Sequence, residues 1–315
     1  MSEINKDNLP LAIFLMGPTA SGKTALAVEL AEKINAEIIS VDSALVYKGM
    51  DIGTAKPSME ERKGIKHHLI DIIDPADAFS TGSFRSLALA LMSDITSRGK
   101  VPLLTGGTML YFNSLFNGLA DLPEANPEIR KKLDNELVTK GKDVLYQRLK
   151  RIDPESAERI HRNDPQRIQR ALEVFEISGK SMTQFFREAQ QNHIPYKKIK
   201  IIVAPKDRKL LHEKIAKRFK LMIEQGLLGE VDALLQRGDL TEKMPSIRAV
   251  GYRQIWAYLH GEYNLDMAVE KGIIATRQLA KRQFTWLRRE QDSMQFVSAE
   301  KNLVNNVWGS IKPYF

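Results

Sequence analysis

The sequence of 315 residues contains no cysteine. This absence excludes disulfide bonds and zinc sites with cysteine ligands, and it favours a reducing compartment. No apolar run approaches the ~18 residues that a membrane-spanning helix needs. The first ten residues mix acidic, basic and polar side chains, so we expect no secretory signal peptide. The sequence therefore predicts a cytoplasmic protein with no membrane partner.

Positive charge is concentrated in the second half of the chain. The net charge is +8, but residues 1–120 carry −2, residues 121–200 carry +4 and residues 201–290 carry +6. A polyanionic partner such as a nucleic acid would use this asymmetry for steering and affinity. A solvated, lysine-rich surface is the alternative explanation.

A glycine-rich segment at residues 17–24 fits the pattern G-x-x-x-x-G-K-[ST] of the phosphate-binding loop (P-loop). Residues 11–16 before it predict a buried strand, and residues 25–32 after it predict a helix. In this context the backbone N–H groups and the helix N-terminus bind a di- or triphosphate. Lys23 adds a point charge, and the Thr24 hydroxyl can hold Mg²⁺. The residues of the predicted site are Gly17, Pro18, Thr19, Ala20, Ser21, Gly22, Lys23 and Thr24.

Strand and helix patterns alternate through the first part of the chain. We predict further strands at residues 37–41, 67–73 and 101–105, and a helix at residues 81–97. This alternation predicts an α/β fold with a doubly wound, mostly parallel sheet, and ligands at the carboxyl ends of its strands.

A helical insertion follows the first part of the core. Asn126-Pro127, Asp153-Pro154 and Asp164-Pro165 each predict a helix start, with the capping residue followed by proline. The strand pattern returns at residues 200–204, and Asp207 caps a further long helix. We therefore predict a core from residues 1–117 and 196–315, and a helical insertion domain that binds RNA at residues 118–195.

Two charged residues are candidates for chemistry at the phosphate site. Asp42 directly follows a strand, where it could hold Mg²⁺ through water, act as a general base, or cap the next turn. Arg218 falls on the apolar stripe of its helix, and a buried guanidinium needs an anion. A diphosphate or a structural carboxylate could supply that anion, or the guanidinium could instead extend along the helix to solvent.

Three clusters outside the phosphate loop could contact RNA. Gln166 to Arg170 open a helix, and residues 246–254 and 275–289 are rich in Arg, Gln and aromatic residues. Such side chains suit phosphates, base edges and stacking, although a solvated helix face is the simpler explanation for each cluster alone. The six histidines show no metal-ligand spacing, and we interpret them as structural or surface residues.

Taken in order, these motifs resemble the bacterial tRNA dimethylallyltransferases, also called tRNA isopentenyltransferases. Besides the phosphate loop, the matching segments are Ser40-Val41-Asp42-Ser43, Val46 to Pro57, His67 to Asp71, Gly106-Gly107-Thr108, Asp164 to Arg167, Val250 to Gln254 and Thr276 to Gln283. Many family members have Gln where this chain has Leu45. Eukaryotic members can add a Cys/His zinc finger, which a chain without cysteine does not carry.

The resemblance implies transfer of a dimethylallyl group from its diphosphate to N6 of adenosine 37 in tRNA. By this resemblance Asp42 takes the N6 proton, Thr19 contacts the diphosphate, and Arg218 stabilises it with Mg²⁺ at Thr24. We expect a monomer, although the sequence does not determine the oligomeric state. The residues expected to face tRNA are Asp42, Ser43, Ala44, Leu45, Thr108, Arg130, Gln166, Arg167, Ile168, Gln169, Arg170, Ile247, Arg248, Ala249, Val250, Gly251, Tyr252, Ala280, Lys281, Arg282, Gln283, Phe284, Thr285, Trp286 and Leu287.

Three other functions remain open. The same chemistry could act on a free adenine nucleotide, as in cytokinin-forming isopentenyltransferases, but a mononucleotide needs neither the basic insertion nor the basic C-terminal helix. A nucleotide or metabolite kinase would have a lid with paired arginines, and we identify no such lid in the sequence. A non-enzymatic RNA-binding ATPase switch is the third possibility.

Overall fold

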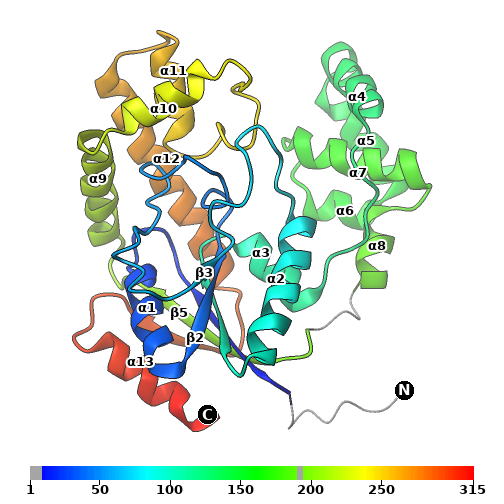
Figure 1. Ribbon diagram of the computed structural model, residues 1–315. Helices are drawn as coiled ribbons and strands as arrows, with labels where there is room; N and C mark the ends of the chain where they lie inside the picture. The colour runs from blue at the N-terminus through cyan, green and yellow to red at the C-terminus, as the bar shows by residue number, and fades with distance from the viewer. Residues whose placement is uncertain (1–8, 190–193) are drawn as a thin grey trace. The chain divides into compact units, whose positions relative to one another are not determined.

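The computed structural model describes residues 9–189 and 194–315 (Figure 1). The chain divides into two compact units. The core unit comprises Met1–Phe112 and Pro195–Phe315, and the helical unit comprises Asn113–Ile194. The sequence-based prediction places the helical insertion at residues 118–195.

A six-stranded sheet of parallel strands forms the centre of the core unit, with the order β3-β2-β4-β1-β5-β6. Its strands are β1 (Leu11–Met16), β2 (Ala36–Val41), β3 (His67–His68), β4 (Val101–Gly106), β5 (Lys197–Ala204) and β6 (Ser293–Val297). β1 lies between β4 and β5, and its residues from Ala12 to Met16 are fully buried, as expected for a central parallel strand covered on both faces. The predicted α/β class with a parallel sheet is confirmed.

Two strands differ from the prediction. The predicted strand at residues 67–73 pairs only at His67 and His68, because Leu69 and Asp71 have φ angles of 60° and 57° and break the extended backbone. β6 was not predicted, since its sequence Ser-Met-Gln-Phe-Val is short and only half-buried.

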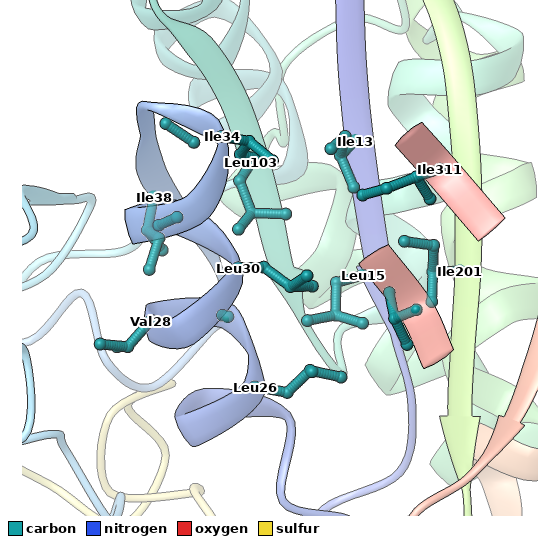
Figure 2. Close-up of a cluster of buried hydrophobic side chains, with 14 of the residues drawn as sticks. Ile13, Leu15, Leu26, Val28, Leu30, Ile34, Ile38, Leu103, Ile201 and Ile311 are labelled. Atoms are coloured by element: carbon teal, nitrogen blue, oxygen red, sulfur yellow. The ribbon is translucent and has the colours of Figure 1, made fainter. Parts of the chain in front are cut away.

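Helices pack on both faces of this sheet. Besides those of the helical unit, the helices of the chain are α1 (Lys23–Ile34), α2 (Thr81–Ser97), α3 (Met109–Asn117), α9 (Arg208–Glu224), α10 (Leu227–Gln236), α11 (Tyr252–Leu259), α12 (Leu265–Leu287) and α13 (Leu303–Ile311), followed by a short 3₁₀ helix (Lys312–Tyr314). On one face Leu30 of α1 and Ile311 of α13 pack in one cluster with Leu15 of β1 (Figure 2). Phe14 points to the other face, where its ring meets that of Phe112 in α3 edge to face. Alternate residues of β1 thus serve two separate layers.

A second cluster joins α9 to α12 with the segment that follows β2. Phe219 of α9 packs there with Tyr47 and Tyr252. A Cβ on Gly272 of α12 would lie 2.1 Å from the Phe219 ring, so the absence of a side chain lets the two helices approach. This packing fixes α9 and α12 relative to the segment after β2.

The helical unit contains α4 (Pro127–Lys140), α5 (Lys142–Ile152), α6 (Pro154–Arg159), α7 (Pro165–Ser178) and α8 (Met182–Ala189) (Figure 1). Asn126, Asp153 and Asp164 cap α4, α6 and α7, with proline at the first helical position. These three predicted helix starts are confirmed. In the part of the chain that the structure describes, no helix combines the length and apolar character needed to cross a membrane.

Candidate functional site

The phosphate loop lies between the carboxyl end of β1 and the start of α1. A Cβ on Gly17 would lie 2.2 Å from the Val203 carbonyl oxygen of β5, so a side chain there would displace the loop from the sheet. Gly22 has a φ of 83° and precedes the first turn of α1. Ala20 also has a positive φ, 62°, a conformation that costs a non-glycine residue about 1 kcal/mol or more. The glycines therefore set the path of the loop around the helix N-terminus.

Lys23 is half-buried inside this loop. Its Nζ donates hydrogen bonds to the Pro18 carbonyl oxygen at 2.6 Å and to the Ser21 hydroxyl at 3.4 Å. Burial lowers the pKa of Lys23 from 10.5 to about 7, while the Asp42 carboxylate opposes this shift and the Arg218 guanidinium adds to it. A bound anion would stabilise the protonated amine.

Arg218 extends from α9 to the same loop. Its guanidinium donates a hydrogen bond of 2.6 Å to the Thr19 hydroxyl. Burial lowers the pKa of Arg218, and the Asp42 carboxylate opposes that shift. Within residues 9–189 and 194–315 no carboxylate lies within ion-pair distance of Arg218. Of the two anions open in the sequence analysis, a structural carboxylate is therefore absent from the described residues.

Asp42 begins the segment after β2. Its Oδ1 accepts hydrogen bonds from the N–H groups of Ala44 at 2.8 Å and Leu45 at 3.4 Å. One carboxylate oxygen thus caps the next turn, as one of the sequence-based alternatives predicts. The neighbouring Ser43 N–H donates to the Thr108 hydroxyl at 3.1 Å, and this bond joins the ends of β2 and β4.

Gln283 of α12 is bonded to the phosphate loop itself. Its Oε1 accepts a hydrogen bond from the Thr19 N–H, and its Nε2 donates to the Gly107 carbonyl oxygen, each at 2.9 Å. The resemblance implies that Gln283 faces tRNA. In the structure its buried amide bonds to backbone groups of the loop and of the β4 end, and Gln283 also lines the cavity. The sequence around Gln283 does not distinguish it from the other glutamines of this basic helix, so these two hydrogen bonds could not be predicted.

A cavity of about 850 Å³ brings these groups together in the core unit. The predicted site residues that line it are Thr19, Ala20, Ser21, Gly22, Lys23, Thr24, Asp42, Ser43, Ala44, Leu45, Thr108, Arg218, Arg248, Ala249, Val250, Arg282, Gln283 and Trp286. Segments from β2, β4, α9 and α12 therefore converge on the phosphate loop. This is the carboxyl edge of the sheet, where ligands bind in doubly wound folds.

Several residues predicted to face tRNA have buried side chains. Ile247 and Tyr252 are 0% exposed, and Ala280, Leu287 and Ile168 are at most 3% exposed. Gly251 is also buried and precedes α11 with a φ of 96°. These residues belong to the hydrophobic cores or shape the backbone, so their side chains are not available to a macromolecular ligand. The exposed residues beside them on α12 are Lys281, Arg282, Thr285 and Trp286, with Phe284 half-buried.

In the helical unit, the residues predicted to face tRNA, Arg130 and Gln166 to Arg170, include both hydrogen-bonded and exposed side chains. Glu173 is completely buried and accepts hydrogen bonds from Arg130, Arg170 and the Asn126 N–H. Burial raises the pKa of Glu173, and these partners more than offset that effect, so its pKa lies below the usual range. Gln169 donates to Asp134 at 2.6 Å. Gln166 and Arg167, by contrast, are exposed at the start of α7.

The described residues contain no group of three or more His, Asp or Glu side chains arranged to hold a metal ion. The residue that the sequence predicts as a metal ligand, Thr24, is exposed at the first turn of α1 and lines the cavity. A divalent cation there would need oxygen ligands from a bound phosphate in addition to the protein.

A parallel sheet, a phosphate-loop sequence after β1, a half-buried arginine with no ion-pair partner among the described residues and an adjacent carboxylate define an α/β protein with a candidate site for a phosphorylated ligand. Residues 45–290 match the model of the family described as IPP transferase. The chain belongs to this family.

Known proteins of the same kind match nearly the whole chain. The tRNA dimethylallyltransferase of Methylococcus capsulatus is 55% identical over 285 residues, which are 90% of this chain and 91% of that protein. The crystal structure of a full-length tRNA isopentenylpyrophosphate transferase from Bacillus halodurans is 35% identical, with a TM-score of 0.72 over 96% of both chains. A structure of a eukaryotic dimethylallyltransferase acting on tRNA has a TM-score of 0.83 and 26% identity, covering 97% of this chain and 79% of that chain.

Proposed function

We propose that this protein transfers the dimethylallyl group of dimethylallyl diphosphate to N6 of adenosine 37 in tRNA, in the cytoplasm. The carbon–oxygen bond between the allylic carbon and the diphosphate breaks, and a bond from that carbon to N6 forms. Diphosphate leaves with the electron pair of the broken bond. The proposal is supported by the family membership and, above all, by one cavity lined by Lys23, Arg218 and Asp42.

Negative charge develops on the diphosphate as the allylic bond breaks. Lys23, Arg218 and the loop amides line the region where this charge would lie. Preorganised donors of this kind stabilise a transition state without reorganising during the reaction. The contact between Arg218 and the Thr19 hydroxyl fixes the guanidinium beside the loop before any ligand arrives.

The amine of adenosine must lose a proton when it forms the new bond. In this proposal Asp42 accepts that proton, which balances the reaction. Its Oδ1 is held by the Ala44 N–H, so the carboxylate has a fixed orientation at the cavity wall. A positioned carboxylate of this kind accelerates proton transfer by roughly 10²–10⁴-fold.

Mg²⁺ fits this site as a partner of the diphosphate. The exposed Thr24 hydroxyl at the start of α1 would hold it together with phosphate oxygens, as Ser/Thr does in other phosphate loops. When bound, the ion would neutralise part of the charge of the leaving diphosphate.

RNA rather than a free nucleotide is proposed as the acceptor. Arg248, Arg282 and Trp286 line the cavity, and Lys281 and Thr285 are exposed on the same helix as Arg282. Arg and Lys suit the phosphate backbone, and an indole can stack on an unpaired base. The exposed Gln166 and Arg167 of the helical unit would add contacts to the anticodon arm.

The experiment that tests this function offers labelled dimethylallyl diphosphate with bulk tRNA, AMP or ATP as acceptor. We expect label in tRNA only, at N6 of adenosine 37. Label in AMP or ATP would instead indicate the free-nucleotide enzyme. Release of phosphate from ATP without label transfer would indicate a kinase or an ATPase switch.

A further inference from the structure

Glu230 of α10 receives four hydrogen bonds although no motif singles it out in the sequence. Its Oε2 accepts from the N–H groups of Asp51 at 2.8 Å and Ile52 at 2.7 Å. Its Oε1 accepts from the Gly53 N–H at 3.1 Å and from the Tyr252 hydroxyl at 2.5 Å. Three consecutive backbone amides thus surround one carboxylate, which is the arrangement of an anion-binding nest.

The Tyr252 side chain contacts both the Glu230 carboxylate and the backbone of Gly53. Tyr252 is 0% exposed. A Cβ on Gly53 would lie 2.5 Å from the Tyr252 ring, so only glycine lets the backbone at residue 53 pack against this ring. Burial and the adjacent Glu230 carboxylate raise the pKa of Tyr252, which keeps its hydroxyl a donor. The residue predicted to face tRNA therefore acts on the backbone of residues 51–53.

A lysine fixes the other end of the same segment. Lys56 donates to the Tyr47 carbonyl oxygen at 3.0 Å and pairs with Asp51 and Asp71. We call residues 51–57 the wall segment. Four of its residues line the cavity of the phosphate loop; they are Gly53, Thr54, Ala55 and Pro57. Glu230 itself does not line this cavity, so it acts on the cavity only through the wall segment.

We infer that Glu230 is a positioning residue of the transfer site, because its carboxylate, together with the Tyr252 hydroxyl, holds the wall segment in place beside the phosphate loop. This inference rests on the proposed function for the identity of the ligand. Among the described residues, neither Glu230 nor the Tyr252 hydroxyl is hydrogen-bonded to the loop from Gly17 to Thr24. The wall segment therefore contributes to binding of the dimethylallyl group and the acceptor, and the loop binds the diphosphate independently.

The test compares Glu230→Gln with Asp232→Asn in the full-length protein. Both changes replace a carboxylate by an amide on α10, but Asp232 only accepts a hydrogen bond from Gln236 of the same helix. Glu230→Gln presents an NH₂ group to a ring of donors, so two of the four bonds are lost. Tyr252→Phe removes one of the bonds and leaves the ring that supports Gly53.

Two measurements do not depend on turnover. Hydrogen exchange at the amides of residues 51–53 should be about tenfold faster or more in Glu230→Gln, and unchanged in Asp232→Asn. The Kd of dimethylallyl diphosphate should rise about tenfold, whereas the Kd of inorganic diphosphate should change less than twofold. Tyr252→Phe should produce the same pattern with smaller changes.

Turnover supplies the third measurement. With tRNA as acceptor, kcat/KM for dimethylallyl diphosphate should fall about tenfold in Glu230→Gln and stay at the wild-type level in Asp232→Asn. Unchanged exchange at residues 51–53, or equal losses of affinity for both diphosphates, in a folded Glu230→Gln or Tyr252→Phe protein would overturn the inference. If the wild-type protein transfers no dimethylallyl group, the proposed function fails, while the exchange and the two Kd values still decide the role of Glu230.

Discussion

Arg218 and Thr19 lie 199 residues apart in the chain, and a 2.6 Å hydrogen bond joins the guanidinium of one to the hydroxyl of the other. The bond fixes a half-buried cation, without an ion-pair partner in the described part of the chain, beside the phosphate loop. A cation in this position is costly to the folded protein unless an anion binds there. The apolar stripe of α9 thus places at the cavity wall a cation that a bound anion would stabilise.

Replacement of Arg218 by Gln should therefore separate function from stability. We expect kcat/KM for dimethylallyl diphosphate to fall by roughly 10²-fold, because a donor to the leaving group is lost. The Tm should remain within a few degrees of the wild-type value, since no structural carboxylate loses its partner. Steady-state kinetics and thermal unfolding measure the two effects. Lys217→Gln, an exposed neighbour on α9, is the control. A large fall in Tm with wild-type kinetics would assign Arg218 a structural role.

Asp42→Asn should stop turnover without disturbing the fold. The asparagine oxygen can still accept the hydrogen bond from the Ala44 N–H, so the turn after β2 is retained. Turnover should fall by two to four orders of magnitude, because an amide is not a base at neutral pH. Single-turnover kinetics at saturating substrates, with a separate measurement of tRNA affinity, test this. Lost tRNA affinity with intact chemistry would show that Asp42 is not the base.

The local parts of this fold were predictable because their signals are local. β1, the phosphate loop and the three proline-marked helix starts each depend on residues within a few positions of one another. Arg218 was also found, because a charged residue on an apolar stripe conflicts with the pattern around it. The strand at residues 67–73 was overestimated, since apolar content does not reveal the left-handed backbone of Leu69.

Long-range side-chain contacts around the cavity leave no local signal in the sequence. Gln283 and Glu230 act on backbone groups 264 and up to 179 residues away, and an amide or carboxylate on a helix surface looks the same whether it faces solvent or a loop. The motif around Tyr252 was assigned to RNA for a related reason. Sequence identifies a segment as part of the site but does not say which of its side chains are buried.

Two changes on α12 should separate its buried and exposed faces. Gln283→Leu removes the acceptor of the Thr19 N–H and the donor to Gly107, so we expect kcat/KM for dimethylallyl diphosphate to fall about tenfold or more. Affinity for tRNA should stay within twofold. Lys281→Gln should have the opposite pattern, with weaker tRNA binding and an unchanged KM for the diphosphate. If Gln283→Leu mainly weakened tRNA binding, its assignment to the loop would be wrong.

Diphosphate binding should depend on pH through Lys23. The pKa of this residue in the free protein is about 7, so the amine is charged below that pH and loses its proton above it. A bound diphosphate favours the charged form, and binding above pH 7 must therefore take up a proton. We expect the affinity for inorganic diphosphate to fall by up to tenfold per pH unit above pH 7.

Calorimetry in two buffers with different ionisation enthalpies measures this proton uptake. The diphosphate titrates as well, and Lys23→Met provides the baseline for its contribution. The wild-type protein should take up close to one additional proton near pH 8. Equal uptake by both proteins would mean that Lys23 is already protonated in the free protein at that pH.

The lowered pKa of Lys23 also affects the stability of the folded protein. The unfolded chain, with a Lys pKa of 10.5, binds more protons between pH 7 and 10.5, so this residue's contribution to stability rises with pH across that window.

Arg167 and Arg170 should differ although they are three residues apart on α7. The Arg167 side chain is 71% exposed and pairs with Asp164 at 3.3 Å, whereas Arg170 bonds to the fully buried Glu173 at 2.6 Å. Arg167→Gln should weaken tRNA binding, and the slope of log affinity against log salt should become shallower by about one as a phosphate contact is lost. Its Tm should stay near the wild-type value.

Arg170→Gln should act mainly on stability. Glu173 keeps Arg130 and the Asn126 N–H but loses one charged partner in a buried position, which costs about 1–3 kcal/mol of unfolding free energy. The double change Arg170→Gln with Glu173→Gln should recover part of this loss, because the buried charge is then removed as well. Chemical denaturation and salt titrations of tRNA binding measure both arginines in parallel. A shallower salt slope in Arg170→Gln at unchanged stability would place Arg170 at the RNA surface after all, and an unchanged slope in Arg167→Gln would remove Arg167 from it.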